Sequence, residues 1–294
     1  MNTVVAVIKS MRIRQWIKNM FVFMPLVFSG RLLEAGDLVR TALAFALFCL
    51  ASSGVYILND IGDKKKDSFH PVKQKRPIAS GALGESTATV FSAVLIITSL
   101  VLSFTLKPEL SGIILAYVVL HAFYTFRFKH EVILDVIIIA LGFELRIWGG
   151  CVVVDILPSV WLQLCVFLLA LFLGFIKRRN EKILLYGDAT KHRDVLSHYK
   201  VYFLDQMAII SATLCIVFYG MYAVSKEVIV RVGTNKMAYT IPFVVYGIFR
   251  YLYVVHAKRS GGDPGEILLT DLPLVVDISL WISVTILLLY YPFK

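Results

Sequence analysis

The chain has 294 residues, of which 58% are hydrophobic and 17% are charged, and its formal net charge is +10. Ordinary soluble domains are less apolar and more charged, so the composition excludes that class. Apolar runs of about 18 or more residues recur, whereas the short alternating segments of a transmembrane β-barrel do not, so we expect an all-α, polytopic membrane protein.

The apolar runs predict nine transmembrane helices, since each run is long enough to cross a hydrocarbon core of about 30 Å. The first run is short and contains Pro25 and Gly30. We expect the whole chain, residues 1–294, to form one integral membrane domain. The nine predicted spans cover residues 17–34, 39–59, 85–106, 110–127, 132–152, 158–176, 206–225, 238–256 and 274–292.

The distribution of lysine and arginine predicts the orientation of the chain in the membrane. If the N-terminus is cytoplasmic, 21 of these residues fall on the cytoplasmic side and seven on the other side. Cytoplasmic loops of membrane proteins carry such an excess of positive charge. We therefore expect the two long charged loops, 60–84 and 177–205, to face the cytoplasm and to carry the polar site.

An acidic motif follows the second span, within the stretch YILNDIGDKKKDSFHPVKQKRPIASG. Its members, Asn59, Asp60, Asp63 and Asp67, stand at offsets 0, 1, 4 and 8, so a helix that continues beyond the membrane places them along one face. Like charges at this spacing repel, and a divalent cation removes that penalty. Mg²⁺ takes carboxylate oxygens and usually bridges to substrate phosphates. The motif therefore predicts a Mg²⁺–phosphate site; the alternative is a solvated acidic turn neutralised by the neighbouring lysines.

The segments NDIGDKKKD and KRPIASG resemble the first aspartate-rich motif, NDxxDxxxD, of the UbiA superfamily of intramembrane prenyltransferases. The four residues of the acidic motif match it position by position. The resemblance implies nine helices around a central cavity that opens to the cytoplasmic side and to the lipid. It also implies that the motif binds Mg²⁺ and the diphosphate of the substrate.

The chain departs from this family pattern after the sixth span, where most members carry a second acidic motif, DxxxD. Here it reads GFIKRRNEKILL, and Lys177, Arg178 and Glu181 (the basic cluster) share one helical face. Arginine offers a planar fork of donors and lysine a point charge, so this face suits a phosphate better than a second Mg²⁺. Arg179 and Lys182 look surplus to such a site. The alternative is that the cluster only marks the cytoplasmic side.

This version of the second motif resembles one subgroup, the decaprenyl-phosphate phosphoribosyltransferases. The segments RQWIKN near the start and GGDPGEILLTDLPL near the end resemble the same subgroup. So does the stretch YTFRFKHEVILDVIIIALGFELRIWGG, with Tyr124, Lys129, Asp135 and Arg146 at matching places. The resemblance implies a 5-phosphoribosyl diphosphate donor, a polyprenyl monophosphate acceptor, and the products diphosphate and polyprenyl-phosphoryl-phosphoribose.

The charges of the chain suit two anionic substrates. The donor carries a 5-phosphate and a diphosphate, and the acceptor is also a phosphate, so the site must be more cationic than one Mg²⁺ makes it. The lipid phosphate is ionised at neutral pH and is a competent nucleophile, so no general base is expected. Catalysis then rests on positioning the substrates and on stabilising the leaving diphosphate.

Arg146 and Arg250 lie in the interior of predicted spans. Burying a charge in a membrane is expensive, so such a residue usually faces a polar cavity or a partner. We expect Arg146, in the fifth span, to contact a phosphate; the alternative is a structural contact with another helix. Arg250 lies in the cytoplasmic half of the eighth span, where its side chain is able to snorkel.

These inferences together define an expected site with Mg²⁺ as its cofactor. Asp60, Asp63, Lys177 and Arg178 are expected to be catalytic, and the four residues of the acidic motif are the expected metal ligands. Further substrate-binding residues are expected among Lys18, Asn19, Tyr56, Asn59, Asp67, Lys75, Arg76, Tyr124, Lys129, Asp135, Arg146 and Glu181.

The predicted function is Mg²⁺-dependent transfer of 5-phosphoribose to a polyprenyl phosphate, at the cytoplasmic face of a bacterial-type inner membrane. The expected partners are the donor, the lipid and the bilayer, and a second copy of the chain is a further candidate. No nucleic acid is expected, because anionic substrates and orientation explain the basic composition. One alternative is a prenyltransferase that alkylates an aromatic or other small acceptor. Another is a transporter of a phosphorylated anion, although no clear internal repeat surrounds the charged motifs.

Overall fold

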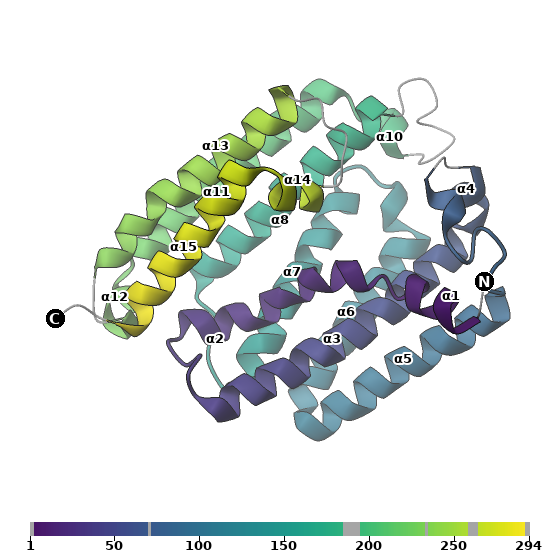
Figure 1. Cartoon of the computed structure of the whole chain (residues 1–294), viewed down its shortest axis with the longest axis horizontal. Helices are drawn as coiled ribbons and strands as arrows, with labels where there is room; N and C mark the ends of the chain where they lie inside the picture. The colour runs from purple at the N-terminus through teal and green to yellow at the C-terminus, as the bar shows by residue number, and fades with distance from the viewer. Residues whose placement is uncertain (1–2, 70–71, 185–194, 233–234, 258–263, 292–294) are drawn as a thin grey trace. The chain divides into compact units, whose positions relative to one another are not determined.

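The computed structural model describes residues 3–69, 72–184, 195–232, 235–257 and 264–291, and the described residues contain helices and no strands (Figure 1). Eight helices in these ranges are long and apolar enough to cross a membrane. The expected all-α, multi-pass membrane architecture is therefore confirmed, whereas the count of nine spans is not. The charge count also included residues outside the described ranges, namely Lys191, Arg193, Lys258, Arg259 and Lys294.

The chain divides into two compact units. The first unit comprises the described residues of Met1–Leu26, Glu34–Leu157 and Gly187–His198. The second comprises those of Val27–Leu33, Pro158–Tyr186 and Tyr199–Lys294. The single domain over residues 1–294 and its central cavity remain predictions.

The first unit is built around four long helices, in which α3 packs against α5 and α6, and α7 packs against α6 and η1 (Figure 1). Short helices connect these long ones at their ends. The elements are α1 (Thr3–Ser10), η1 (Ile13–Phe23), α3 (Ala35–Gly62), α4 (Lys64–Phe69), η2 (Lys73–Lys75), α5 (Glu85–Leu106), α6 (Pro108–Phe126), η3 (Phe128–His130), α7 (Leu134–Val153) and α10 (Val195–His198).

The second unit also contains four long helices, with α8 packed along α11 and α13 packed against α15. Its elements are α8 (Val160–Leu184), α11 (Val201–Val224), α12 (Lys226–Val232), η4 (Lys236–Thr240), α13 (Ile241–Ala257), α14 (Pro264–Thr270) and α15 (Leu272–Tyr290). In the sequence, α2 (Met24–Phe28) joins the two units.

Small residues bring α3 and α5 close together. A Cβ atom added to Gly54 would meet Ile96 Cγ1 at 2.6 Å and the carbonyl oxygen of Ser92 at 3.0 Å. The Ser92 hydroxyl donates to the Gly54 carbonyl oxygen at 2.8 Å, and Ser99 donates to that of Leu47 at 2.8 Å. Close backbone approach and hydroxyl-to-carbonyl bonds are the usual means of joining helices in lipid, where apolar contact alone gives little preference. The last turn of α3, packed in this way, carries Asn59 and Asp60 of the acidic motif.

The first predicted span, residues 17–34, differs most from the expectation. It begins within η1, an 11-residue 3₁₀ helix, and continues into the five-residue α2. Gly30 then takes a φ of 77°, in the left-handed region that favours glycine. The segment is therefore not one of the eight long α-helices.

Nevertheless, η1 runs antiparallel along α3. Asn19 donates to the Ser52 hydroxyl at 3.1 Å, and the ring of Phe23 lies 5.7 Å from that of Phe45. At about 2.0 Å per residue, an 11-residue 3₁₀ helix is about 22 Å long. That length carries the chain along most of a hydrocarbon core of about 30 Å. The N-terminal residues therefore lie at the same end of α3 as Asp60.

Candidate active site

The acidic motif lies where α3 ends and α4 begins. Asn59 and Asp60 are in the last turn of α3, Asp63 follows the end of that helix, and Asp67 is on α4. The Asp63 N–H donates to the Asn59 carbonyl oxygen at 2.9 Å, and the Asp67 N–H donates to that of Asp63 at 2.8 Å. The expected continuous helix is therefore broken at Asp63, although the backbone hydrogen bonds continue across the break.

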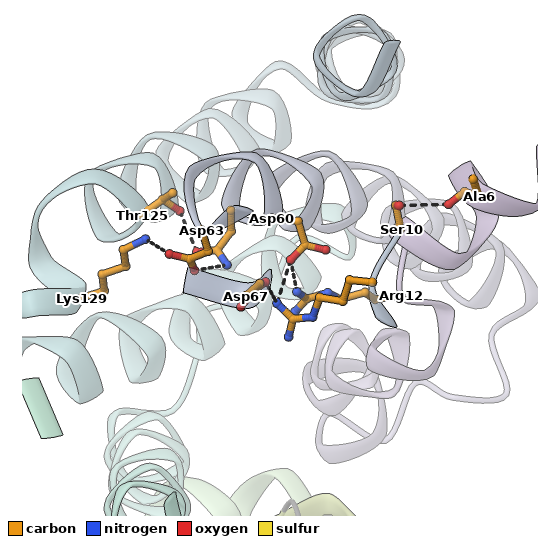
Figure 2. A network of polar contacts seen from close by, with 10 residues as sticks. Ala6, Ser10, Arg12, Asp60, Asp63, Asp67, Thr125 and Lys129 are labelled. Carbon is orange, nitrogen blue, oxygen red and sulfur yellow. Dashed lines mark hydrogen bonds and ion pairs between the residues drawn. The ribbon is translucent and has the colours of Figure 1, made fainter. Parts of the chain in front are cut away.

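Two arginines converge on Asp60, as the close-up in Figure 2 shows for Arg12. Arg12 Nη2 and Arg76 Nη1 both donate to Asp60 Oδ1, the second at 3.0 Å. Arg76 Nη1 also donates to Asp67 Oδ2 at 2.6 Å. The side chains of Asp60 and Asp67 are only 3% and 5% exposed. Burial of two carboxylates is tolerable here because each has a cationic hydrogen-bond donor.

Asp63 has a different set of partners, on the other side of Asp60 in Figure 2. Lys129, on η3, donates to Asp63 Oδ1 at 2.5 Å, and Asn59 donates to Asp63 Oδ2 at 3.1 Å. The Thr125 hydroxyl, at the end of α6, donates to Asn59 Oδ1 at 3.4 Å. These contacts join the acidic motif to the segment that connects α6 with α7. The structure thus brings Lys129 and Arg76, both predicted from the sequence, to the acidic motif.

The oxygen donors of this motif fit Mg²⁺ by their chemistry. In the described part of the chain, no group of three or more His, Cys, Asp or Glu side chains is arranged to hold a metal ion. Mg²⁺ in phosphate-handling sites is usually held by only one or two carboxylates together with substrate phosphates. Asp60 Oδ1 and Asp67 Oδ2 share the same Arg76 nitrogen, so they are no further apart than the sum of those two contacts. A pair of carboxylates at this separation suits such a shared metal.

Arg146, on α7, occupies a buried polar network in the first unit. Its Nε donates to Asn19 Oδ1 at 2.7 Å, its Nη1 to the Gly142 carbonyl oxygen at 2.6 Å, and its Nη2 to the Tyr117 hydroxyl at 3.0 Å. Its guanidinium also lies 4.7 Å from the centre of the Tyr117 ring. These partners connect η1, α6 and α7, in agreement with the structural alternative. The phosphate contact stays a prediction.

The other predicted substrate-binding residues of the first unit lie on several elements. Tyr56, on α3, has the Arg12 guanidinium 5.3 Å from its ring centre. Tyr124, on α6, lies near His121, with 6.3 Å between ring centres. Lys18 is half-buried on η1, Asp135 is buried in the first turn of α7, and Lys75 is exposed on η2. Their roles remain predictions.

The basic cluster belongs to the second unit, at the end of α8. Arg178 is 2% exposed and donates to Glu181 Oε2 at 2.7 Å, one helical turn away. Lys177 is half-buried on the same helix. The expected shared face of Arg178 and Glu181 is therefore present. That the basic cluster and the acidic motif form one site stays a prediction.

Arg179 and Arg250 have structural partners that the sequence did not suggest. Arg179 Nε donates to Asp205 Oδ1 at 2.5 Å and so ties α8 to α11, a structural role that agrees with its being surplus to a phosphate site. Arg250 makes a two-pronged contact with Asp271, with its Nε 2.9 Å from Oδ1 and its Nη2 3.0 Å from Oδ2. Asp271 also caps α15, accepting from the Leu274 N–H at 3.3 Å.

Arg12 and Thr125 are site residues that the sequence analysis missed. From the sequence, Arg12 is only one of the charges that set orientation. Its partner Asp60 is 48 residues away, and no helical spacing relates the two. One signal was available: Arg12 stands two residues before the RQWIKN segment. Thr125 offered no signal, because a threonine near the end of an apolar span is ordinary.

Comparison with known proteins decides the family. The family model for the UbiA prenyltransferase family matches residues 22–264, which is most of the chain. This protein belongs to the UbiA prenyltransferase family. It is a transferase-type enzyme of that family, as the sequence predicted, and it resembles the decaprenyl-phosphate phosphoribosyltransferases.

Two relatives within the UbiA family carry that name. The decaprenyl-phosphate phosphoribosyltransferase of Mycolicibacterium smegmatis is 33% identical, over 96% of this chain and 92% of its own length. That of Corynebacterium glutamicum is 30% identical, over 96% of this chain and 86% of its own. Among solved structures, a UbiA homolog from Archaeoglobus fulgidus bound to DMAPP and Mg²⁺ superposes with a TM-score of 0.75. It covers 97% of this chain and 99% of its own, at 14% identity, and therefore shows the shared fold alone.

Proposed function

We propose that this enzyme transfers 5-phosphoribose from 5-phosphoribosyl diphosphate to a polyprenyl phosphate and releases diphosphate. The observation that carries the proposal is the charge of the acidic motif. Its three carboxylates are accompanied by three cations, Arg12, Arg76 and Lys129. A site with this balance becomes cationic when it takes up Mg²⁺, and a cationic site favours a donor with several phosphate charges.

Two further features support the same substrates. Relatives that align with 96% of this chain are named for phosphoribosyl transfer to decaprenyl phosphate. The second acidic motif that most family members carry is replaced by Lys177 and Arg178. Both cations suit a phosphate, either the 5-phosphate of the donor or that of the lipid.

In the proposed reaction, a phosphate oxygen of the lipid attacks C1 of the ribose. The bond from C1 to the diphosphate oxygen breaks, and the diphosphate leaves with the bonding electrons. Asp60, Asp63 and Asp67 would hold Mg²⁺, which would supply positive charge to stabilise the leaving diphosphate. Lys129 and Asn59 orient Asp63 beside them. No general base is needed, because the attacking phosphate is already ionised.

We also propose that the enzyme works in a bacterial inner membrane, with the acidic motif facing the cytoplasm. The support is the excess of lysine and arginine on that side and the bacterial origin of its relatives. Phosphoribosyl diphosphate is water-soluble and the acceptor is a lipid. An active site at the membrane surface gives access to both.

The deciding experiment measures diphosphate release by the detergent-purified enzyme with Mg²⁺. We expect release, and a new phosphoribosylated lipid by mass spectrometry, with phosphoribosyl diphosphate and decaprenyl phosphate together. Release only with a prenyl diphosphate and an aromatic acceptor would establish the prenyltransferase alternative. Asp63→Asn and a chelator should each abolish turnover, and an Asp63→Asn protein that melts like wild type shows that the loss is not unfolding.

A further inference from the structure

Arg12 has a backbone conformation that an arginine rarely adopts. It lies between α1 and η1 with φ 52° and ψ 53°, in the left-handed region. That region is unfavourable for residues with a Cβ, and glycine or asparagine usually occupies it. Strained residues of this kind persist where the surrounding structure holds them, and they gather at functional sites. The unfavourable conformation of Arg12 therefore suggests that its side chain has a function that glycine could not perform.

The surrounding structure holds this junction firmly. The Ser53 hydroxyl, on α3, donates to the Met11 carbonyl oxygen at 3.1 Å and accepts from Trp16 Nε1 at 3.0 Å. The Gln15 N–H donates to the Arg12 carbonyl oxygen at 2.7 Å. With the backbone fixed on both sides, the left-handed turn directs the Arg12 side chain over Tyr56 and onto Asp60. The strain therefore serves the placement of one guanidinium.

Arg12 and Arg76 are more exposed than the carboxylates that they contact, Asp60 and Asp67. Both arginines contact the same oxygen, Asp60 Oδ1. Their side chains are 24% and 26% exposed, whereas that of Asp60 is 3% exposed. An anion that approaches this place therefore meets the two guanidiniums before it meets the carboxylate. Among the described residues, only Nη2 of Arg12 has a hydrogen-bond acceptor, so Nε and Nη1 remain for a ligand.

We propose that Arg12 is a substrate-binding residue that grips the diphosphate of the substrate together with Arg76. Asp60 holds the Arg12 guanidinium in place through Nη2, and its remaining N–H groups donate to phosphate oxygens, as a planar guanidinium does well. The inference rests on the proposed function only in requiring a diphosphate substrate. Both phosphoribosyl and prenyl donors supply that group.

The test compares Arg12→Gly, Arg12→Ala and Arg12→Lys with wild type. The readouts are the melting temperature in detergent and the affinity for inorganic diphosphate with Mg²⁺, measured by titration calorimetry. We expect all three variants to bind diphosphate about ten- to a hundredfold more weakly, which is the usual effect of losing one charge-assisted bond. Arg12→Gly should melt at a higher temperature than Arg12→Ala, because glycine removes the backbone strain.

Arg14→Ala is the matched control, because Arg14 is exposed in the same segment. It should bind diphosphate like wild type. Wild-type affinity in Arg12→Gly, or an equal loss in Arg14→Ala, would overturn the proposal and leave Arg12 a structural tie. Inorganic diphosphate is the probe, so the result is independent of the phosphoribosyl donor. If that donor fails as a substrate while Arg12→Gly still loses diphosphate, the proposed function fails and this inference stands.

Discussion

Arg76 Nη1 lies 2.6 Å from Asp67 Oδ2, and the same nitrogen lies 3.0 Å from Asp60 Oδ1. One nitrogen thus joins the last turn of α3 to α4, a helix of only six residues. Isolated helices of that length are not stable in water, so α4 depends on contacts of this kind. Arg76 therefore helps to fix the position of Asp67 relative to Asp60.

Replacing Arg76 should loosen the acidic motif. Arg76→Ala leaves the buried Asp67 carboxylate without the cation that it has here, which should lower the free energy of unfolding by about 1–3 kcal/mol. Mg²⁺ supplies a substitute charge, so it should raise the melting temperature of Arg76→Ala more than that of wild type. Thermal melts with and without Mg²⁺ measure both effects.

Two controls accompany this prediction. Lys75→Ala removes a neighbouring exposed cation and should leave both melts unchanged. Arg76→Lys should keep more stability than Arg76→Ala, because a single nitrogen makes both contacts and an ammonium group is able to do the same. If Arg76→Lys melts like Arg76→Ala, the single-nitrogen bridge is wrong.

Arg178 and Arg179 are adjacent, but replacing the first should impair catalysis whereas replacing the second should impair stability. Arg178→Ala removes a buried guanidinium held by Glu181, and should raise KM for an anionic substrate or lower kcat by about ten- to a hundredfold. Arg179→Ala breaks the tie from α8 to Asp205 on α11, and should lower the free energy of unfolding by about 1 kcal/mol with KM unchanged. Kinetics and thermal melts on both variants separate the two roles. Equal behaviour in both assays would reduce the basic cluster to an orientation signal.

Most of the fold followed from apolar length, because a lipid environment requires long helices with satisfied backbones. The segment 17–34 differs from the predicted transmembrane α-helix because an apolar composition is compatible with both a 3₁₀ helix and an α-helix. Their difference here comes from packing: a Cβ on Gly150 of α7 would collide with the carbonyl oxygen of Val22 on η1. The two residues of this contact, Val22 and Gly150, lie far apart in the sequence, so no local pattern predicts it.

Site residues that lie close together in the sequence could be predicted from it, whereas those with distant partners could not. The acidic motif and Arg76 lie within 18 residues, so their spacing alone indicated a common site. Lys129 was named only through the family resemblance, and the structure gives it a partner in Asp63. Arg12 reaches Asp60 through a left-handed turn, and sequence spacing carries no trace of that conformation. The structural role of Arg179 has no local signal either, because its partner, Asp205, belongs to another helix.

Asp271 should prove structural although it lies in a segment that resembles one enzyme subgroup. It accepts two hydrogen bonds from Arg250 and caps α15. Asp271→Ala should lower the free energy of unfolding by about 1.5–3 kcal/mol, while the KM of either substrate stays within twofold. Asp271→Asn keeps an oxygen for the cap and should lose less. A tenfold rise in KM in a protein that melts normally would instead place Asp271 among the substrate-binding residues.

The orientation of the chain is open to a direct labelling test. Ser68 and Ser197 are exposed and lie in the two loops expected to face the cytoplasm. The four native cysteines are buried, so background labelling should be low. Cysteines introduced at Ser68 and Ser197 should react in intact cells only with membrane-permeant maleimide.

A cysteine at Leu157, which is 83% exposed and lies in a loop predicted to face outward, is the matched control and should react with the impermeant reagent. Labelling of Ser68→Cys by the impermeant reagent would invert the topology. The acidic motif would then be closed to a cytoplasmic donor, and the proposed reaction would lose its substrate.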